Sequence, residues 1–448
     1  MYPYRTNQMG ELRAIVDDQD ADLIEHLVAD MVADSGRLHT VSAYYEGTYR
    51  PKGLNVSIPK KLMHLINSGL GWGKIIVDTL AERLVIYDVQ GVDLEGVIPF
   101  EQLRNVAVRL HTEILRYGRA YLLVSAHPET GKPVLTVRTP LNTAALVDQS
   151  TGRVTHGVSI EQDYKGTEYA SVYLPGKVVA LEREKTGEHF HIVDTMDSAV
   201  MPLIAFSNVG DVSEISPSIQ SLMDMASTSL VYAKLNEEFF SFPQRYVLGV
   251  DEDTFRDANT GEPISKWKAR IDSLFILERS ESGNNPEVGE FRTNLSDGYM
   301  RMVEYLSSQV AAEAGLPATY FGISTQQALS AEAIEKMENR LVRKALTRRD
   351  LWSIPWAYTI ETIAKLAGVT SSEQISVMWG SPRNPSLGAT ADAVVKLVGA
   401  GVLPATSNAV LQLLNIDTEL QGELRTEQQA ASAMSNLDRV LGALNEGE

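Results

Sequence analysis

The spacing of hydrophobic residues predicts long amphipathic helices on both sides of a strand-rich section. Apolar residues recur every three or four positions, as on the buried face of a helix, in several segments. These segments are 9–35, 75–84, 100–117, 215–242, 296–314 and 331–366. Shorter helices are expected near the C-terminus, at 391–398, 407–414 and 419–444. Helices that are separated from the strands along the chain indicate an α+β fold.

Between residues 119 and 206 the pattern changes to short runs that alternate between apolar and polar positions or are rich in β-branched residues. Gly, Pro and Asp separate these runs, so we predict a meander of strands. The predicted strands are 120–126, 133–139, 157–164, 169–175, 178–184 and 189–195. Gly131, Gly152 and Gly187 each stand third in a candidate turn, where a residue with positive φ is needed.

Two of the helices enclose a small insert. Helix 215–242, about 40 Å long at about 1.5 Å per residue, precedes it, and helix 296–314 follows it. The insert, 245–292, contains predicted strands at 246–250 and 273–278 and a polar loop at 279–290. The order is therefore an outgoing helix, a compact tip and a returning helix.

The helix at 331–366 combines a defined start, an internal proline and a row of cations. Ser330 suits the N-cap position, because its hydroxyl can accept a hydrogen bond from a free amide of the first turn. Pro355 lacks an amide hydrogen and clashes with the preceding turn, so we expect a kink there. Away from the apolar face lie four cations, Arg340, Arg343, Lys344 and Arg348. They form either a solvated face of a core helix or a basic belt that faces a polyanion or an acidic neighbouring subunit.

The composition adds limits to this picture. The chain has 448 residues, enough for two or more domains, and its hydrophobic fraction of 44% is ordinary for a globular protein. It has no cysteine, which excludes disulfides, thiol nucleophiles and thiolate metal sites. The first residues contain no apolar signal region, and no window approaches the roughly 20 apolar residues of a membrane span. We therefore expect a soluble cytoplasmic protein with no membrane partner.

The formal net charge of −18 argues against tight binding of nucleic acid over the whole surface. Such affinity depends on many contacts from Lys and Arg to phosphate groups. The charge is compatible with DNA that passes the protein without being held. A mostly negative wall with a few basic rings repels and guides a duplex.

No known catalytic motif stands in the chain, and no catalytic residue or cofactor is predicted. The stretch 69–74 is similar to a phosphate-binding loop, but Ser68 replaces its first glycine and Ile75 replaces the Ser or Thr that binds Mg²⁺. A plain loop before a helix is the simpler interpretation. We therefore predict that the protein is not an enzyme, and keep a nucleotide hydrolase that uses this loop as an alternative.

Two other patterns are similar to metal sites but lack the residues that a metal ion needs as ligands. Asp251 and Asp253 start a sequence similar to a calcium loop, but Phe255 and Arg256 occupy positions that need an oxygen ligand and a glycine. A solvated turn fits those residues better. His189 and His191 share one face of a predicted strand without a third ligand nearby, so we interpret them as an exposed pair. No metal site is predicted.

Eight short segments, taken in chain order, carry a family resemblance. They are YYEG at 44–47, GWG at 71–73, IVDTLAERL at 76–84, FPQRYVLG at 242–249, GLP at 315–317, YFG at 320–322, SAEAI at 330–334 and RLVRKA at 340–345. Together they resemble the portal proteins of tailed bacteriophages, the head–tail connector rings, in the branch called Gp6-like. The similarity extends from about residue 44 to residue 414.

The resemblance implies a ring of about twelve copies of the chain at one capsid vertex, with double-stranded DNA passing through its axis during packaging and ejection. It also implies that the ring docks large terminase and later a head-completion or adaptor protein, and that it contacts major capsid and scaffolding proteins. It places the protein in the virion, and in the host cytoplasm during assembly. An oligomeric adaptor without a DNA channel is the alternative.

By the same resemblance the chain divides into portal regions. These are a wing at 1–214 that includes the strand-rich part 119–206, stem helices at 215–243 and 294–319, a clip at 244–293, a tunnel loop at 320–330, a long kinked helix with a wing return at 331–383 and a helical crown at 384–448. The loop residues proposed to line the narrowest part of the tunnel are Thr325, Gln326, Gln327, Ala328, Leu329 and Ser330. Their Gln-Gln-Ala-Leu sequence differs from the Asn- and Gly-rich loops of relatives.

Overall fold

The computed structural model describes residues 10–50, 69–184, 189–240, 245–248, 287–290, 297–323, 331–370, 374–383, 387–404, 407 and 410. The chain forms two compact units. Unit 1 contains Met1–Ala328 and Met337–Pro382, and unit 2 contains Leu329–Lys336 and Arg383–Glu448. The α+β fold expected from the sequence is confirmed, and the described strands all lie in unit 1.

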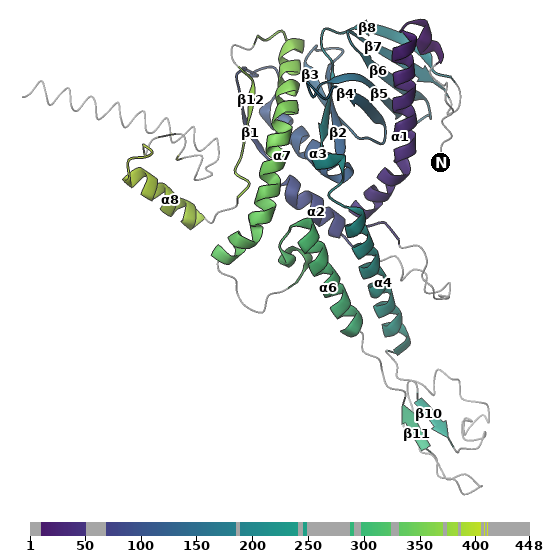
Figure 1. The fold of residues 1–448 in the computed structure, drawn as a ribbon, viewed down its shortest axis with the longest axis vertical. Helices are drawn as coiled ribbons and strands as arrows, with labels where there is room; N and C mark the ends of the chain where they lie inside the picture. Colours follow the sequence, from purple (N-terminus) through teal and green to yellow (C-terminus); the bar gives the residue numbers. More distant parts are fainter. Residues whose placement is uncertain are drawn as a thin grey trace, which may run out of the picture. The chain divides into compact units, whose positions relative to one another are not determined.

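The helices and strands carry the labels of Figure 1. The helices are η1 (Gly10–Ala14), α1 (Asp18–Tyr45), α2 (Trp72–Ala81), α3 (Phe100–Tyr117), η3 (Val209–Asp211), α4 (Pro217–Phe240), α6 (Asp297–Ala314), η5 (Ala318–Phe321), α7 (Ala331–Leu366) and α8 (Leu387–Gly399). The strands are β1 (Ile86–Gln90), β2 (Arg119–Ala126), β3 (Pro133–Arg138), β4 (Thr143–Val147), β5 (Val154–Gln162), β6 (Glu168–Leu174), β7 (Lys177–Arg183), β8 (His191–Asp197), β9 (Leu203–Ser207), β10 (Arg245–Leu248), β11 (Glu287–Glu290) and β12 (Ser376–Trp379).

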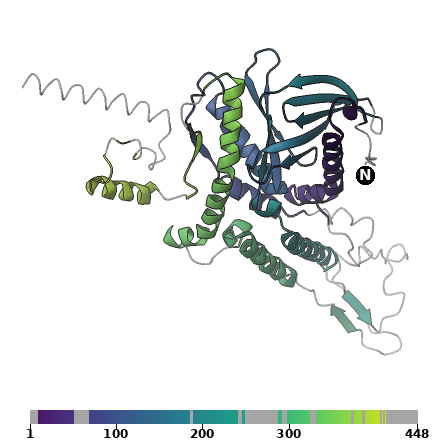
Figure 2. The ribbon, with the colours of Figure 1, turned by 45° about the horizontal axis from the view of Figure 1, so that its top comes forward.

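Within the described ranges, the strands form two larger sheets and two strand pairs. In the five-stranded sheet, β4 to β8 lie in chain order as an antiparallel meander, seen at the top right of Figure 2. The three-stranded sheet has β2 in the middle, antiparallel to both β3 and β9. β1 pairs with β12, and β10 pairs with β11, so both pairs join segments that are distant in the sequence.

Helix α1 covers the five-stranded sheet with its N-terminal half. Its residues Ile24 and Met31 share one apolar cluster with Val158 of β5 and Val172 of β6. Figure 1 shows α1 lying beside this sheet. Because alternate residues of a strand point to opposite faces, the buried set on β5 and β6 forms one continuous apolar face for the helix.

The turn between β4 and β5 attaches this sheet to α7. Tyr358 Oη donates a hydrogen bond of 2.8 Å to the Thr151 carbonyl. The Arg153 guanidinium donates one of 2.7 Å to Glu361 and lies 4.2 Å from the centroid of the Tyr358 ring. These contacts hold the sheet against the C-terminal half of α7.

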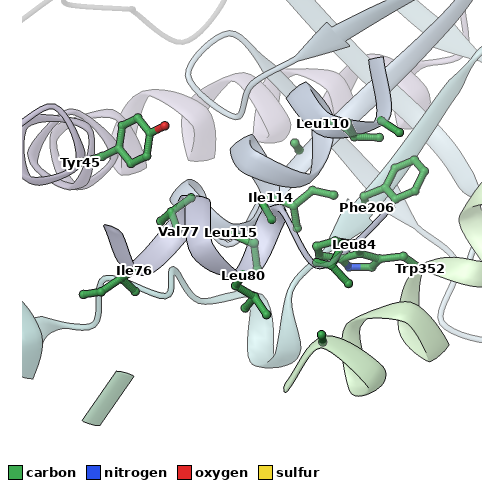
Figure 3. Close-up of a cluster of buried hydrophobic side chains, with 14 of the residues drawn as sticks. Tyr45, Ile76, Val77, Leu80, Leu84, Leu110, Ile114, Leu115, Phe206 and Trp352 are labelled. Carbon is green, nitrogen blue, oxygen red and sulfur yellow. The ribbon is translucent and has the colours of Figure 1, made fainter. Parts of the chain in front are cut away.

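The main core lies where α2, α3 and α7 meet β9. Figure 3 shows side chains of α2 and α3 gathered with Trp352 of α7 and Phe206 of β9. His111 of α3 is fully buried and stacks on Trp352, with ring centroids 4.8 Å apart. Its Nδ1 lies 3.0 Å from the Leu84 carbonyl, and its Nε2 accepts a hydrogen bond of 3.0 Å from Trp356 Nε1. Because a carbonyl only accepts and an indole N–H only donates, His111 is neutral with its proton on Nδ1.

Two helices have the bounds that the sequence predicts, and others differ at their ends. Helices α3 and α7 match the predicted ranges, and Gly118, with φ of +92°, ends α3. The prediction of one helix at 9–35 is wrong, because a 3-10 turn precedes α1 and α1 continues to Tyr45. Its buried positions continue through Leu38 and Val41, so the apolar face does not stop at residue 35. Helix α2 begins at Trp72 rather than at residue 75.

The strand predictions are confirmed in part. Six predicted strands correspond to β2, β3, β5, β6, β7 and β8, but the unpredicted strands β4 and β9 divide the expected meander into two sheets. Residues 287–290, predicted as loop, form β11, because pairing with β10 supplies their hydrogen bonds. Gly131 and Gly152 have the predicted positive φ, +66° and +71°. The predicted strand 273–278, the turn glycine Gly187 and the helix 419–444 lie outside the described residues.

The buried His111 predicts a dependence of stability on pH. Burial lowers the pKa of its imidazole to about 3, whereas a histidine in the unfolded chain titrates near about 6.5. Its contribution to stability is fully present above about pH 6.5. Below that value only the unfolded chain takes up the proton, so the free energy of unfolding should fall by about 1.4 kcal/mol per pH unit.

Thermal unfolding of His111→Asn and of the parent protein between pH 7.5 and pH 5 tests this expectation. The variant should unfold at a lower temperature at pH 7.5 and lose less stability as the pH falls. His39→Asn, at an exposed position of α1, is the matched control and should keep the parent slope. Equal slopes for His111→Asn and the parent protein would contradict a neutral buried imidazole.

Candidate functional site

Helices α4 and α6 lie side by side as an antiparallel pair, with β10 and β11 beyond their far ends (Figures 1 and 2). The predicted order of outgoing helix, small insert and returning helix therefore agrees with the structure at the level of these elements. At the near end, Ser216 and Ser218 at the start of α4 donate hydrogen bonds of 2.9 and 2.7 Å to the carboxylate of Glu313 on α6. These bonds fix where α4 begins relative to where α6 ends.

Helix α7 crosses this end of the pair and supplies cations to it. We call the contact the helix junction, defined by Asn208, Glu214, Ala312, Ala314, Arg340, Lys344 and Arg348. Lys344 Nζ lies 2.6 Å from a Glu214 carboxylate oxygen, and Arg348 donates a bond of 2.6 Å to the other oxygen. Arg348 Nε also donates to Asn208 Oδ1 at 3.0 Å. Two of the four predicted belt residues are thus used inside the chain.

The same cations cover the C-terminal end of α6. Arg340 donates a hydrogen bond of 2.5 Å to the Ala312 carbonyl, and Lys344 donates one of 2.8 Å to the Ala314 carbonyl. The last carbonyls of a helix lack partners within the helix and carry partial negative charge, so cations are favourable there. Gly315, with φ of +74°, turns the chain at this point, and a Cβ on it would lie 2.9 Å from Arg340 Nε.

Glu214 is the buried centre of the helix junction. Burial alone raises the pKa of its carboxyl, but the charges of Lys344 and Arg348 act in the opposite direction, so its pKa lies below the usual value. The carboxylate therefore stays ionised at neutral pH with two cations against it. The arrangement joins the segment before α4 to α7 and has no feature of acid or base catalysis.

The remaining belt residue, Arg343, points elsewhere. Its side chain is exposed and has no hydrogen-bond or ion-pair partner among the residues that the structure describes. Arg349, beside the predicted row, donates to the Trp379 carbonyl at 3.4 Å, so it packs on β12. The row of cations is therefore divided: Lys344 and Arg348 pair internally, Arg340 covers a helix end while remaining exposed, and Arg343 is left to solvent.

The two other predicted site elements have different outcomes. The tunnel-loop residues Thr325 to Ser330 lie outside the described residues. Helix α7 is continuous across Pro355. The kink at Pro355 stays a prediction.

The segments on either side of 324–330 are tied together by a residue that the sequence analysis did not single out. Arg83, which follows α2, donates to Glu338 of α7 at 3.0 Å and to the Pro382 carbonyl at 3.1 Å. Tyr320 Oη, in η5, donates to the same Glu338 oxygen at 2.5 Å and lies 3.4 Å from Arg83. Arg83 and Tyr320 both stand in segments that carried the family resemblance, which is the signal that could have found them.

The glycine-rich stretch 69–74 has a packing explanation. A Cβ on Gly69 would lie 1.4 Å from the Gly47 carbonyl oxygen, and one on Gly73 would lie 2.5 Å from the Tyr44 carbonyl oxygen. Only glycine lets the backbone before and within α2 approach the end of α1 so closely. The similarity to a phosphate-binding loop thus reflects close contact between two helices.

The described residues, which include the histidine pair, contain no group of side chains that could hold a metal ion. His191 Nδ1 lies 2.8 Å from Glu11 Oε1, and the amide of Ile192 donates to the other oxygen of Glu11. Asp251 and Asp253 lie outside the described residues. Among the described helices, none is both long and apolar enough to cross a membrane.

The helix junction predicts that Glu214→Gln lowers stability strongly. The substitution keeps the shape of the side chain but leaves Lys344 and Arg348 without their counter-charge in a mostly buried place. Breaking one side of such a pair costs about 3 kcal/mol. The unfolding temperature should fall accordingly, whereas Glu304→Gln, at an exposed position of α6, should leave it unchanged. A Glu214→Gln protein that unfolds at the parent temperature would contradict this role.

Comparison with known proteins now gives the family. The family model described as "Phage portal protein, SPP1 Gp6-like" matches residues 25–434. The portal protein of Mycobacterium phage L5 is 23% identical over 449 residues, covering 94% of this chain and 91% of that protein. The portal protein of Mycobacterium phage D29 is 24% identical over 410 residues, covering 85% of this chain and 83% of that protein.

Among solved structures, the chain is similar to the neck of a native gene transfer agent particle, with a TM-score of 0.47, 15% identity and coverage of 80% of this chain and 93% of that one. A portal protein of the HK97 family from Corynebacterium diphtheriae has a TM-score of 0.31 and 13% identity, with coverage of 71% and 92%. The family match spans most of the sequence, and the chain therefore belongs to the SPP1 Gp6-like family of phage portal proteins.

Proposed function

We propose that about twelve copies of this chain form a ring at one capsid vertex and that double-stranded DNA passes through the ring during packaging and ejection. The observation that carries this proposal is the family match over residues 25–434. The pair α4 and α6 supports it, because two adjacent helices that carry a small tip form a suitable repeating wall for a ring. The protein would act in the host cytoplasm during assembly and in the virion afterwards.

The proposed roles of the regions follow the family resemblance. Helices α4 and α6 form the stem, and the clip at 244–293 docks large terminase during packaging and a head-completion or adaptor protein afterwards. The wing at 1–214 contacts major capsid and scaffolding proteins, and 384–448 form the crown. The loop at 320–330 narrows the channel.

The charge of the chain supports passage of DNA without tight binding. The net charge of −18 disfavours extended contact with phosphate groups. Since Lys344 and Arg348 are paired with Glu214 and Arg340 is bound to the Ala312 carbonyl, Arg343 is the belt residue whose side chain contacts no hydrogen-bond or ion-pair partner in the described part of α7. Repeated around a ring, one such charge per subunit gives a narrow positive band on a negative surface.

Electron microscopy and mass measurement of the purified protein test the ring. We expect rings with a central hole and a mass near that of twelve copies of the 49.3 kDa chain, about 590 kDa. A compact monomer would contradict the proposed ring. A closed oligomer without a hole would favour the alternative of an adaptor that has no DNA channel.

The contact with DNA predicts that Arg343→Glu reduces DNA packaging several-fold while rings still form. The reason is that the substitution reverses an exposed charge without breaking an internal ion pair. Arg104→Glu, at an exposed position of α3, is the matched control and should package normally. Packaged DNA per capsid is the measurement, and normal packaging by Arg343→Glu would show that this part of α7 does not face DNA.

Charge reversal at Lys344 or Arg348 is a poorer test of DNA contact. Each substitution would place a second carboxylate beside Glu214 and remove one of its two cations. Loss of packaging in those variants would therefore report on folding of the helix junction as well as on the channel.

A further inference from the structure

We infer that Arg83 is a positioning residue that keeps three parts of unit 1 at fixed distances from one another. These parts are η5, the segment of α7 that begins at Met337, and the end of unit 1 at Pro382. The Arg83 guanidinium contacts Tyr320, Glu338 and Pro382, which come from three separate segments of the chain. We call these four residues the Arg83 clamp. No role in the family resemblance accounts for the arrangement.

The clamp is formed by side chains that are largely withdrawn from water. The side chains of Arg83 and Glu338 are each only 14% exposed. Hydrogen bonds that involve a charged group are about twice as strong as neutral ones, and they gain further strength in a place of low dielectric. The clamp is therefore a strong local connection rather than a solvent-exposed surface ion pair, which contributes little.

The chemistry of the clamp requires an arginine. One guanidinium has several N–H groups in a fixed plane, so it can reach a carboxylate and a backbone carbonyl in different directions at once. In this clamp Nη1 donates to Pro382 and Nη2 donates to Glu338. A lysine offers a single nitrogen at the end of a flexible chain and cannot reproduce both directions with the same geometry.

Tyr320 completes the clamp as a neutral donor. Burial raises the pKa of its phenol, and the neighbouring carboxylate of Glu338 acts in the same direction. The hydroxyl therefore keeps its proton at physiological pH and donates it to Glu338. Glu338 accepts two bonds on one oxygen, one from the segment before 324–330 and one from Arg83.

The position of the clamp in the chain gives it a mechanical role. Unit 1 ends at Pro382, and its second part begins at Met337, one residue before Glu338. The clamp thus lies at both ends of the second part of unit 1. It also includes Tyr320 of η5, the last described helix before 324–330. Tyr320 and Glu338 cannot move apart without breaking the hydrogen bond between them.

This inference deepens the proposed function and rests on it for its meaning. If 320–330 form the tunnel loop of a ring, each loop is pulled or pushed by moving DNA. The clamp would then keep Tyr320, before the loop, and Glu338, after it, at a fixed distance from each other. Removing the clamp would let these two residues move with the loop and would weaken the mechanical link between DNA and the rest of the subunit.

A spin-label distance measurement tests the clamp directly. The chain has no cysteine, so Thr319→Cys and Asn339→Cys place two labels next to Tyr320 and Glu338 without any background. Labelled subunits diluted with unlabelled ones keep the measured distance within a single subunit. We expect one narrow distance distribution for the labelled protein that retains Arg83.

In Arg83→Gln we expect a second, broader distance population that is about tenfold larger than in the protein that retains Arg83. A change of this size is expected for loss of a charge-assisted hydrogen bond. Arg83→Lys should behave in the same way. Exchanging the two charges, as Arg83→Glu with Glu338→Arg, should restore part of the narrow population, which a general loss of stability would not do. Arg104→Gln on α3 is the control and should not change the distribution.

The outcomes separate this inference from the proposed function. An unchanged distribution in Arg83→Gln would overturn the clamp even if rings form and package DNA. Failure of the parent protein to form rings would overturn the proposed function, while the distance within one subunit would still report on the clamp. If Arg83→Gln fails to fold, Tyr320→Phe removes only one hydroxyl and should shift the distribution in the same direction by a smaller amount.

Discussion

The constraint on which the rest of unit 1 depends is that two buried indole N–H groups must each find a hydrogen-bond acceptor. Helix α7 buries Trp352 and Trp356, and each carries an N–H group whose burial costs free energy if it stays unpaired. Trp356 donates to His111, and Trp352 donates to the Ser207 carbonyl at 2.8 Å. His111 donates in turn to the Leu84 carbonyl. The two bonds that α7 makes reach β9 and α3, so together they fix the position of its C-terminal half relative to both elements.

The two ends of α7 pack by different physical means. Its C-terminal half is held by burial of aromatic side chains. Its N-terminal half places cations against carbonyl and carboxylate groups, which apolar side chains cannot pair with. The end of α6 presents carbonyl groups without helical partners, and Arg340 and Lys344 cover them. Glu214 then offsets part of the charge of Lys344 and Arg348. Three of the four cations in the predicted row bind groups of the same chain, and two of these three cover the C-terminal end of α6.

The sequence predicted what depends on neighbours along the chain and missed what depends on distant partners. The apolar spacing of α3 and α7 and the N-cap signal of Ser330 before α7 are local, and the bounds of both helices were predicted as observed. β1 and β12 were missed because each is short and becomes a strand by pairing with the other. The same limit explains the candidate site: the belt residues were recognised, but Glu214, 130 residues away from Lys344, could not be assigned to them. Arg83 stood within a recognised segment, yet its partners come from three other parts of the chain.

The pairing of β10 with β11 has a consequence for how this protein can change over evolutionary time. Leu248 and Glu287 face each other in the register of the pair, so the chain leaves and returns at neighbouring points. The cost of closing a loop rises only slowly with its length. Insertions, deletions or wholesale exchange of the intervening residues can therefore be accepted without changing how α4 packs on α6. This stretch can therefore change in length and sequence while the remaining architecture is inherited unchanged.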